Sequence, residues 1–167
     1  RRVDFSAVRE WIVALDPVLL IVLLVVLPLV GFSVRVLHIA AGIRFGAVWG
    51  MAIVSLSILL QLLASHAIIQ RWGARFERMR WVRRLRERIP QGAHGGVSLV
   101  ALLLPGAPFA AINYVLPLLG VPLRTFLLAA WPIHTLRSTV SVVFGDVSAE
   151  LTPAKLAWLG AYALAMA

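Results

Sequence analysis

Residues 89–123, IPQGAHGGVSLVALLLPGAPFAAINYVLPLLGVPL, form a stretch of 35 residues without an Asp, Glu, Lys or Arg. A straight α-helix of that length would rise about 52 Å, whereas the hydrocarbon core of a bilayer is about 30 Å thick. Pro105 and Pro108 interrupt the stretch near its middle, and each interior proline removes a helical hydrogen bond. Such a break cannot face lipid and must lie inside protein or beside water. The sequence therefore predicts a hairpin that enters the membrane, turns at residues 105–108 and leaves on the same side.

The composition is that of a membrane protein. Of the 167 residues, 61% are hydrophobic, and the mean hydropathy of +0.93 is well above that of a soluble domain. The chain lacks cysteine, which excludes disulfides and thiolate chemistry. Its basic residues are fifteen arginines and one lysine, a bias typical of GC-rich bacteria, so we expect a multi-pass protein of the bacterial inner membrane. Because the sequence begins with Arg1 and ends inside an apolar run, we expect residues 1–167 to be one membrane domain truncated at both ends.

Other segments predict membrane-crossing helices, namely residues 17–34, 45–70 and 124–145, with a last helix beginning at residue 154. Between the first two, Arg35 and Arg44 bracket only eight uncharged residues, which as a helix would rise about 12 Å. That is too short to cross, so residues 31–44 predict a second element that turns inside the membrane.

Glycines surround this second element. We expect Gly31, Gly42 and Gly46 to lie at its turns, because glycine adopts backbone conformations that other residues avoid. Gly42, Gly46 and Gly50 are also spaced four residues apart, and such a stripe of small residues allows close helix packing. The pattern alone does not decide between the two roles.

Residues 71–89 hold eight arginines against Glu77 and Glu87, with apolar residues at helical spacing on one face. We interpret this segment as a basic amphipathic helix on an anionic lipid surface and prefer that reading to nucleic-acid binding. The positive-inside rule then places residues 71–89, and with them the Arg1 end, in the cytoplasm, and the acidic residues 146–152 outside.

Together these features predict an all-α integral membrane protein with two opposed re-entrant hairpins. Each half of the chain holds a broken hairpin followed by a spanning helix, and the halves open to opposite sides of the membrane. This is the arrangement of an inverted repeat with a site near the midplane.

Two motifs resemble a known family. The stretch PLVGFSVRVLHIAAGIRFGAVWG (28–50) resembles the first re-entrant motif of the DedA or VTT superfamily of SNARE-associated Golgi proteins. The stretches PGAPFAAINY (105–114) and GVPLRTFLLAAW (120–131) resemble the second motif, in the branch with the pattern PxxPFxxxNY. The resemblance implies two opposed re-entrant hairpins and a role in moving lipids between leaflets, as phospholipid scrambling or polyprenyl-phosphate recycling.

Arginines supply the candidate headgroup ligands. Arginine at membrane depth is costly and usually functional, and a guanidinium can hold a phosphate with two hydrogen bonds. Arg35 and Arg44 flank the first hairpin, and Arg137 lies about 20 Å into its helix. We interpret these three as candidate substrate-binding residues. The alternative, in which a long side chain reaches the membrane surface, is preferred for Arg124.

Polar residues inside the apolar segments form a second group of candidates. Asn113 and Tyr114 follow the break at 105–108, where Asn113 could contact substrate or bond backbone groups freed by the prolines. His38 and His134 lie in opposite halves and could titrate near neutral pH, although most single histidines are simply hydrogen-bonded.

No enzyme motif is present. The chain has no GxSxG, Walker A, HxxxH or HExxH pattern, and its segments within 17–145 carry no carboxylate outside residues 71–89. We therefore expect no catalytic residues, no metal and no cofactor. The expected function is lipid transport or scrambling, with membrane lipids as partners, no nucleic acid, and room for a homo-oligomer. The alternative is a structural membrane scaffold without transport.

Overall fold

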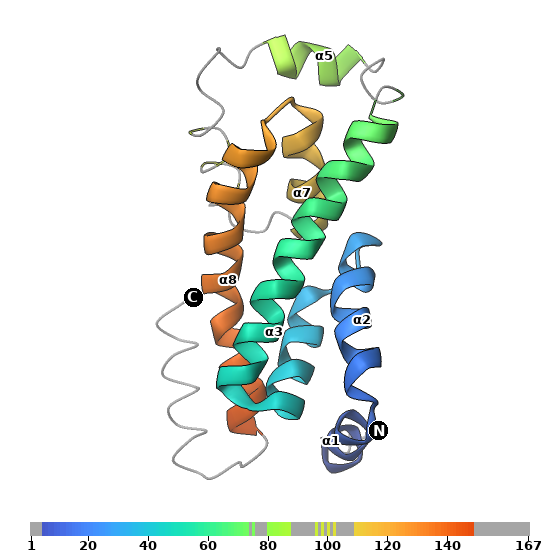
Figure 1. Cartoon of the computed structure of the whole chain (residues 1–167), viewed down its shortest axis with the longest axis vertical. Coiled ribbons are helices and arrows are strands. Elements are labelled where there is room, and N and C mark those ends of the chain that lie inside the picture. Colours follow the sequence, from blue (N-terminus) through green and yellow to red (C-terminus); the bar gives the residue numbers. More distant parts are fainter. Residues whose placement is uncertain are drawn as a thin grey trace.

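The computed structural model describes residues 5–73, 75, 80–87, 96, 98, 100, 102 and 109–148. Every secondary-structure element in this part of the chain is an α-helix, which confirms the all-α prediction. The elements in chain order are α1 (Phe5–Ala14), α2 (Pro17–Leu29), α3 (Val34–Trp72), α5 (Arg80–Glu87), α7 (Phe109–Leu118) and α8 (Leu123–Ser148) (Figure 1).

Helix α2 and the first part of α3 form a helical hairpin. Asp16 caps α2 through its carboxylate, which accepts hydrogen bonds from the backbone N–H groups of Val18 at 2.9 Å and Leu19 at 3.0 Å. The helix ends at Leu29, and the chain turns through Gly31, whose φ is 91°. The 13 residues of α2 rise only about 20 Å, less than a bilayer core. The prediction of a crossing over residues 17–34 was therefore wrong, because this stretch is one arm of a hairpin whose other arm is the start of α3.

Helix α3 bends sharply at Gly46. This glycine has φ 76° and ψ 177°, a conformation essentially restricted to glycine, and it separates residues 34–45 from residues 47–72. The long straight part after the bend agrees with the spanning helix predicted over residues 45–70. Helix α8 likewise agrees with the helix predicted over residues 124–145, and it follows a second glycine turn at Gly120, whose φ is 84°.

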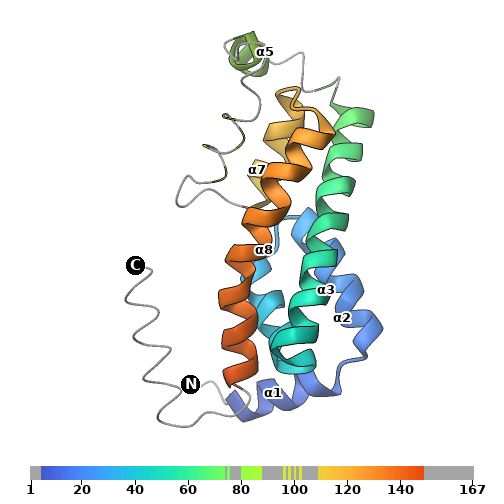
Figure 2. The same cartoon turned by 60° about the vertical axis from the view of Figure 1, so that its left-hand side comes forward.

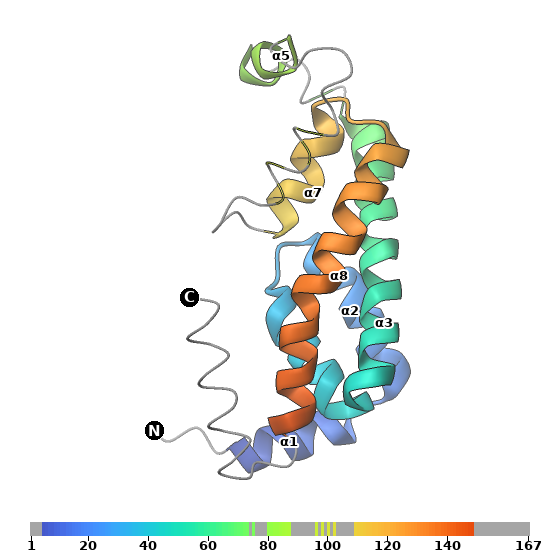
Figure 3. The ribbon, with the colours of Figure 1, turned by 90° about the vertical axis from the view of Figure 1, so that its left-hand side faces the viewer.

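The long part of α3 and α8 pack side by side and form most of the core (Figures 1 and 3). Helix α8 also packs tightly against the short first part of α3, through glycines: a Cβ on Gly42 would overlap the Val142 carbonyl oxygen, and one on Gly145 would overlap the Ile39 carbonyl oxygen. Gly42 is therefore a packing position and not the turn residue that the sequence predicted. Fully buried core side chains of α2, α3, α7 and α8 include Leu20, Leu24, Val54, Ile58, Leu62, Leu116, Phe126 and Val142.

The two ends of the bundle differ. Helix α1 lies across the end that contains the bend of α3 and the end of α8, where Gly46 lies next to Asp146, and α5 lies at the opposite end (Figures 1 and 2). The sequence prediction placed the N-terminal segment and residues 71–89 on one side, because it counted residues 17–34 as a crossing. In the structure α1 and α5 lie at opposite ends of the bundle.

Residues 71–89 were predicted to form one basic helix. Helix α5 corresponds to part of that range, whereas Arg71 and Trp72 belong to the end of α3. The predicted turn at Pro105 and Pro108 and the last helix from residue 154 lie outside the described residues.

Two helices are long and apolar enough to cross a membrane, namely α3 with 39 residues and α8 with 26 residues. Helices α2 and α7 are apolar but shorter. By length and composition, the described part of the chain is thus that of a helical membrane protein.

Candidate functional site

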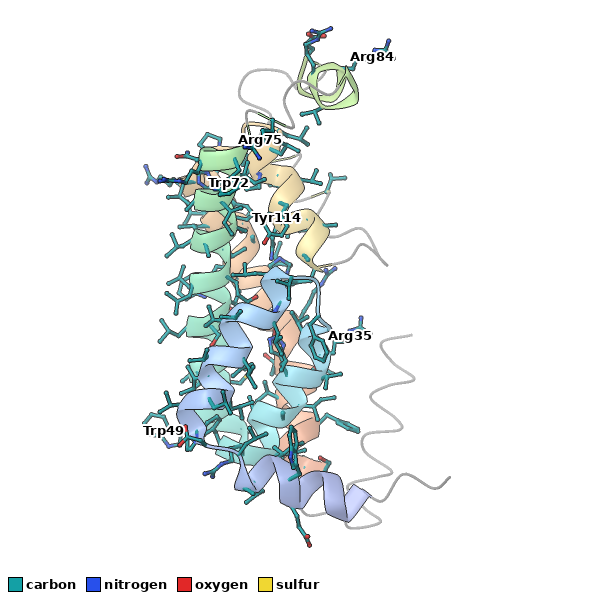
Figure 4. The ribbon with its side chains drawn as sticks, turned by 90° about the vertical axis from the view of Figure 1, so that its right-hand side faces the viewer. Arg35, Trp49, Trp72, Arg75, Arg84 and Tyr114 are labelled. Atoms are coloured by element: carbon teal, nitrogen blue, oxygen red, sulfur yellow. The ribbon has the colours of Figure 1, made fainter. Side chains whose placement is uncertain are left out.

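The tip of the first hairpin meets α7 about halfway along the bundle (Figures 3 and 4). There the hydroxyl of Tyr114 donates a hydrogen bond of 2.7 Å to the backbone carbonyl of Leu29. Leu29 is the last residue of α2, so its carbonyl has no partner within that helix. The tyrosine therefore links two segments that are 85 positions apart in the sequence.

Asn113, the neighbour of Tyr114, links α7 to α8. Its side-chain oxygen lies 3.2 Å from Nε2 of His134, and both residues are buried. Because an amide oxygen only accepts hydrogen bonds, the imidazole must donate from Nε2. The ring of Phe109 packs against the same imidazole, with the ring centroids 4.4 Å apart. Asn113 thus binds a side chain of the bundle, and the backbone groups near Pro105 and Pro108 that the sequence suggested as its partners lie outside the described residues.

His38 approaches this pair from α3. It is buried, and its Nε2 atom has no hydrogen-bond partner among the described residues. Both His38 and Arg137 lie close enough to His134 to act on its charge. We call His38, Asn113, Tyr114 and His134 the central cluster, since three helices bring these residues together.

The arginines lie around the central cluster and not inside it. Arg35 and Arg137 are both exposed, and no ion pair joins either of them to another described residue. Figure 4 places Arg35 at the hairpin tip, about halfway along the bundle. Neither charge is therefore buried inside the protein.

Arg44 lies near the bend of α3, away from the central cluster. It is half-buried, its Nε atom is buried without a hydrogen-bond partner among the described residues, and its guanidinium lies 5.9 Å from the centroid of the Phe45 ring. Nine residues of helix separate Arg44 from Arg35, a rise of about 13 Å. The two arginines that flank the first hairpin in sequence therefore occupy different levels of the bundle.

The sequence analysis did not identify Gln61. This residue is fully buried in α3, and its amide nitrogen donates a hydrogen bond of 2.6 Å to the carbonyl of Leu24 in α2. Pro28 lies four residues after Leu24 and cannot donate to that carbonyl, so the glutamine takes the place of a helical N–H. An amide side chain near the middle of an uncharged segment, together with a proline in the neighbouring helix, was the available signal.

No family model, no curated protein and no solved structure matches this chain in the comparisons. The arguments that follow therefore rest on the residues and the geometry described above.

Proposed function

We propose that this chain is a membrane protein of the DedA or VTT superfamily that moves a lipid with a phosphate headgroup between the two leaflets, without an enzymatic step. The main support is the tip of the first hairpin, which ends halfway along the bundle beside Arg35 and contacts α7 through Tyr114. A hairpin that stops at that depth brings polar backbone to the middle of a membrane. Such breaks occur where they line a path for a polar group.

The repeated order of elements supports an inverted repeat. In the first half, a short helix (residues 34–45) is followed by Gly46 with positive φ and by a long helix. In the second half, α7 is followed by Gly120 with positive φ and by the long helix α8. The two long helices run in opposite directions (Figure 1). In this proposal each half contains one re-entrant hairpin, and the two hairpins enter from opposite sides of the membrane.

Exposed tryptophans support the position of the bilayer. Trp49 and Trp72 are 72% and 54% exposed and lie near the two ends of the long part of α3 (Figure 4). They are 23 residues apart, a rise of about 34 Å, which is close to the thickness of a hydrocarbon core. Tryptophan is enriched at both membrane surfaces, so the pair marks two boundaries. Helix α1, with the exposed Trp11, would then lie in the surface near Trp49.

The charges support one orientation. The α5 end carries the basic segment 71–89, whereas residues 1–16 hold three arginines against three carboxylates and contribute no net charge. The opposite end also carries Asp146. The positive-inside rule therefore places α5 in the cytoplasm and α1 outside. The basic segment would contact the anionic lipids of the cytoplasmic leaflet.

The start of α3 offers two features that attract a phosphate. Its first N–H groups have no helical partners, and the side chain of its N-cap residue, Ser33, makes no capping hydrogen bond. Arg35 lies in the same turn, so in this proposal its guanidinium and the backbone N–H groups of that turn are available to one phosphate near the middle of the membrane. Phosphate groups bind at helix N-termini for both reasons.

Reconstitution into liposomes tests the proposal. Leaflet-specific quenching would follow labelled phospholipid and labelled polyprenyl phosphate, and we expect faster exchange than in empty vesicles. Arg35→Gln removes charge-assisted hydrogen bonds that are each worth about 1.5–3 kcal/mol, so it should slow exchange about tenfold or more. Arg35→Lys should restore only part of the rate, because an ammonium lacks the planar fork. Arg124→Gln, at the exposed start of α8, is the matched control and should have no effect. Exchange no faster than in empty vesicles would favour the scaffold alternative.

A further inference from the structure

We infer that one side of α5, which carries Arg83, Arg84 and Glu87, is a docking surface for an acidic segment of a second, cytoplasmic protein. Such docking goes beyond the movement of lipid and does not require it. Only the cytoplasmic position of α5 rests on the orientation proposed above.

Helix α5 has a closed side and an open side. Val82 is fully buried, whereas the side chains of Arg83 and Glu87 are 70% and 67% exposed and Arg84 is exposed as well. At 3.6 residues per turn, Val82 lies about 160° around the helix from Arg84 and about 140° from Glu87. Figure 4 shows Arg84 on the side of α5 that is turned away from the bundle. The helix therefore packs through one side and presents its charges on the other.

The open side does not face the bilayer. Helix α5 lies across the end of the bundle, beyond Trp72, the last residue of α3 (Figures 1 and 3). Trp72 marks a membrane surface in the proposal above, and the guanidinium of Arg75 lies 5.6 Å from the centroid of its ring. The lipid contacts of the basic segment thus belong to its start, at Arg71 and Arg75, and the open side of α5 is left for a partner in water.

The two arginines of the open side are available to such a partner. Arg84 makes no ion pair with another described residue. The Nε atom of Arg83 lies 3.9 Å from the carboxylate of Glu87, which is longer than a hydrogen bond. An exposed pair at that distance is weak, so a carboxylate from a partner can replace it with closer, charge-assisted hydrogen bonds.

Glu87 distinguishes between the kinds of anionic partner. Around the helix it lies between the two arginines, about 40° from Arg83 and about 60° from Arg84. A nucleic acid binds through a row of phosphates, and a carboxylate within that contact would repel it. An acidic protein segment can place its carboxylates on the arginines and one lysine or arginine on Glu87, so that all three charges are paired. The open side therefore fits an acidic protein segment that contains a basic residue.

Fluorescence anisotropy tests the docking surface. The full chain is placed in nanodiscs of phosphatidylcholine, which has no net charge, and is titrated with a labelled peptide of Glu and Ala with one central Lys. We expect saturable binding that weakens as salt rises, and no binding of a peptide with Gln in place of Glu. A single-stranded oligonucleotide with the same net charge should bind less tightly than the acidic peptide. Absence of peptide binding, or tighter binding of the oligonucleotide, would overturn the inference.

Variants locate the binding. Arg83→Gln combined with Arg84→Gln should weaken peptide binding about tenfold, because two exposed ion pairs are lost. Arg71→Gln combined with Arg75→Gln is the matched control, since it removes the same charge from the same end of the bundle beside Trp72, and it should have little effect. Equal weakening by the two double variants would mean that the total charge of this end, and not the open side of α5, attracts the peptide, which would also overturn the inference.

Two further measurements separate the partners and the functions. Glu87→Gln should strengthen the binding of the oligonucleotide more than that of the peptide, because only the peptide can pair with the carboxylate. An equal change for both ligands would contradict the role of Glu87 in selecting a protein. Lipid exchange in liposomes should be unchanged in the Arg83 and Arg84 double variant, so a failure of docking leaves the proposed function intact.

Discussion

Replacing Tyr114 with phenylalanine tests whether α7 is held against the tip of the first hairpin. The change removes one hydroxyl and leaves the Leu29 carbonyl without the hydrogen bond of 2.7 Å that it accepts. Leaving such a group unpaired costs about 1–3 kcal/mol in proteins, and interhelical hydrogen bonds in a membrane average about 0.6 kcal/mol. Because Tyr114 is half-buried, we expect a cost of about 1 kcal/mol for separating the tips.

Hydrogen exchange in lipid nanodiscs measures this cost. The reporters are the amides of Val30, Gly31 and Phe32, which bond to carbonyls of the last turn of α2. A loss of about 1 kcal/mol should raise their exchange rates about fivefold in Tyr114→Phe. Trp131→Phe is the control, since it removes a hydrogen bond of 3.1 Å to the Ser55 carbonyl on another part of α3. Unchanged exchange in Tyr114→Phe, or equal acceleration in both variants, would refute the tip contact.

Two further predictions concern the proline-freed carbonyl and the basic segment. Gln61→Leu should lower the free energy of unfolding by about 1 kcal/mol, measured by denaturation in mixed micelles, because the Leu24 carbonyl loses its donor. In a Pro28→Ala background, which restores an N–H for that carbonyl, the same change should cost nothing, and an equal cost in both backgrounds would contradict the explanation. A peptide of residues 71–89 should become helical on anionic vesicles, as measured by circular dichroism, and its affinity should fall as salt rises. Equal binding to neutral vesicles would show that charge does not contribute to the binding of this segment.

The sequence was sufficient for the long helices and insufficient for the way they connect. Uncharged length identified the long part of α3, because crossing a bilayer requires about 20 apolar residues, and overall hydropathy identified α8 although Arg137 lies inside it. The same criterion failed for residues 17–34. That stretch has the length of a crossing, but Pro28 and Gly31 end its helix after 13 residues and turn the chain back. Apolar length does not distinguish one crossing from half of a hairpin.

The candidate site was predicted by residue type but not by position. Asn113, Tyr114, His38 and His134 were named from their polarity inside apolar segments, and the structure brings them together. Their partners could not be read from the sequence, because the Tyr114 and His134 contacts join segments 85 and 21 positions away. Arg35 was named as a candidate headgroup ligand between apolar segments, and the structure places it, exposed, at the hairpin tip.

The direction of the first hairpin is the central claim, since it brings Arg35 to the middle of the membrane. The chain has no cysteine, so single cysteines can report the two sides without background. Cysteines replacing the exposed residues Glu10 in α1 and Arg84 in α5 would be treated, in cells, with a maleimide that does not cross membranes. The account predicts labelling of position 10 from outside and of position 84 only from the cytoplasm. Labelling of both positions from the same side would mean that residues 17–45 cross the membrane, which would contradict the hairpin and the site built on it.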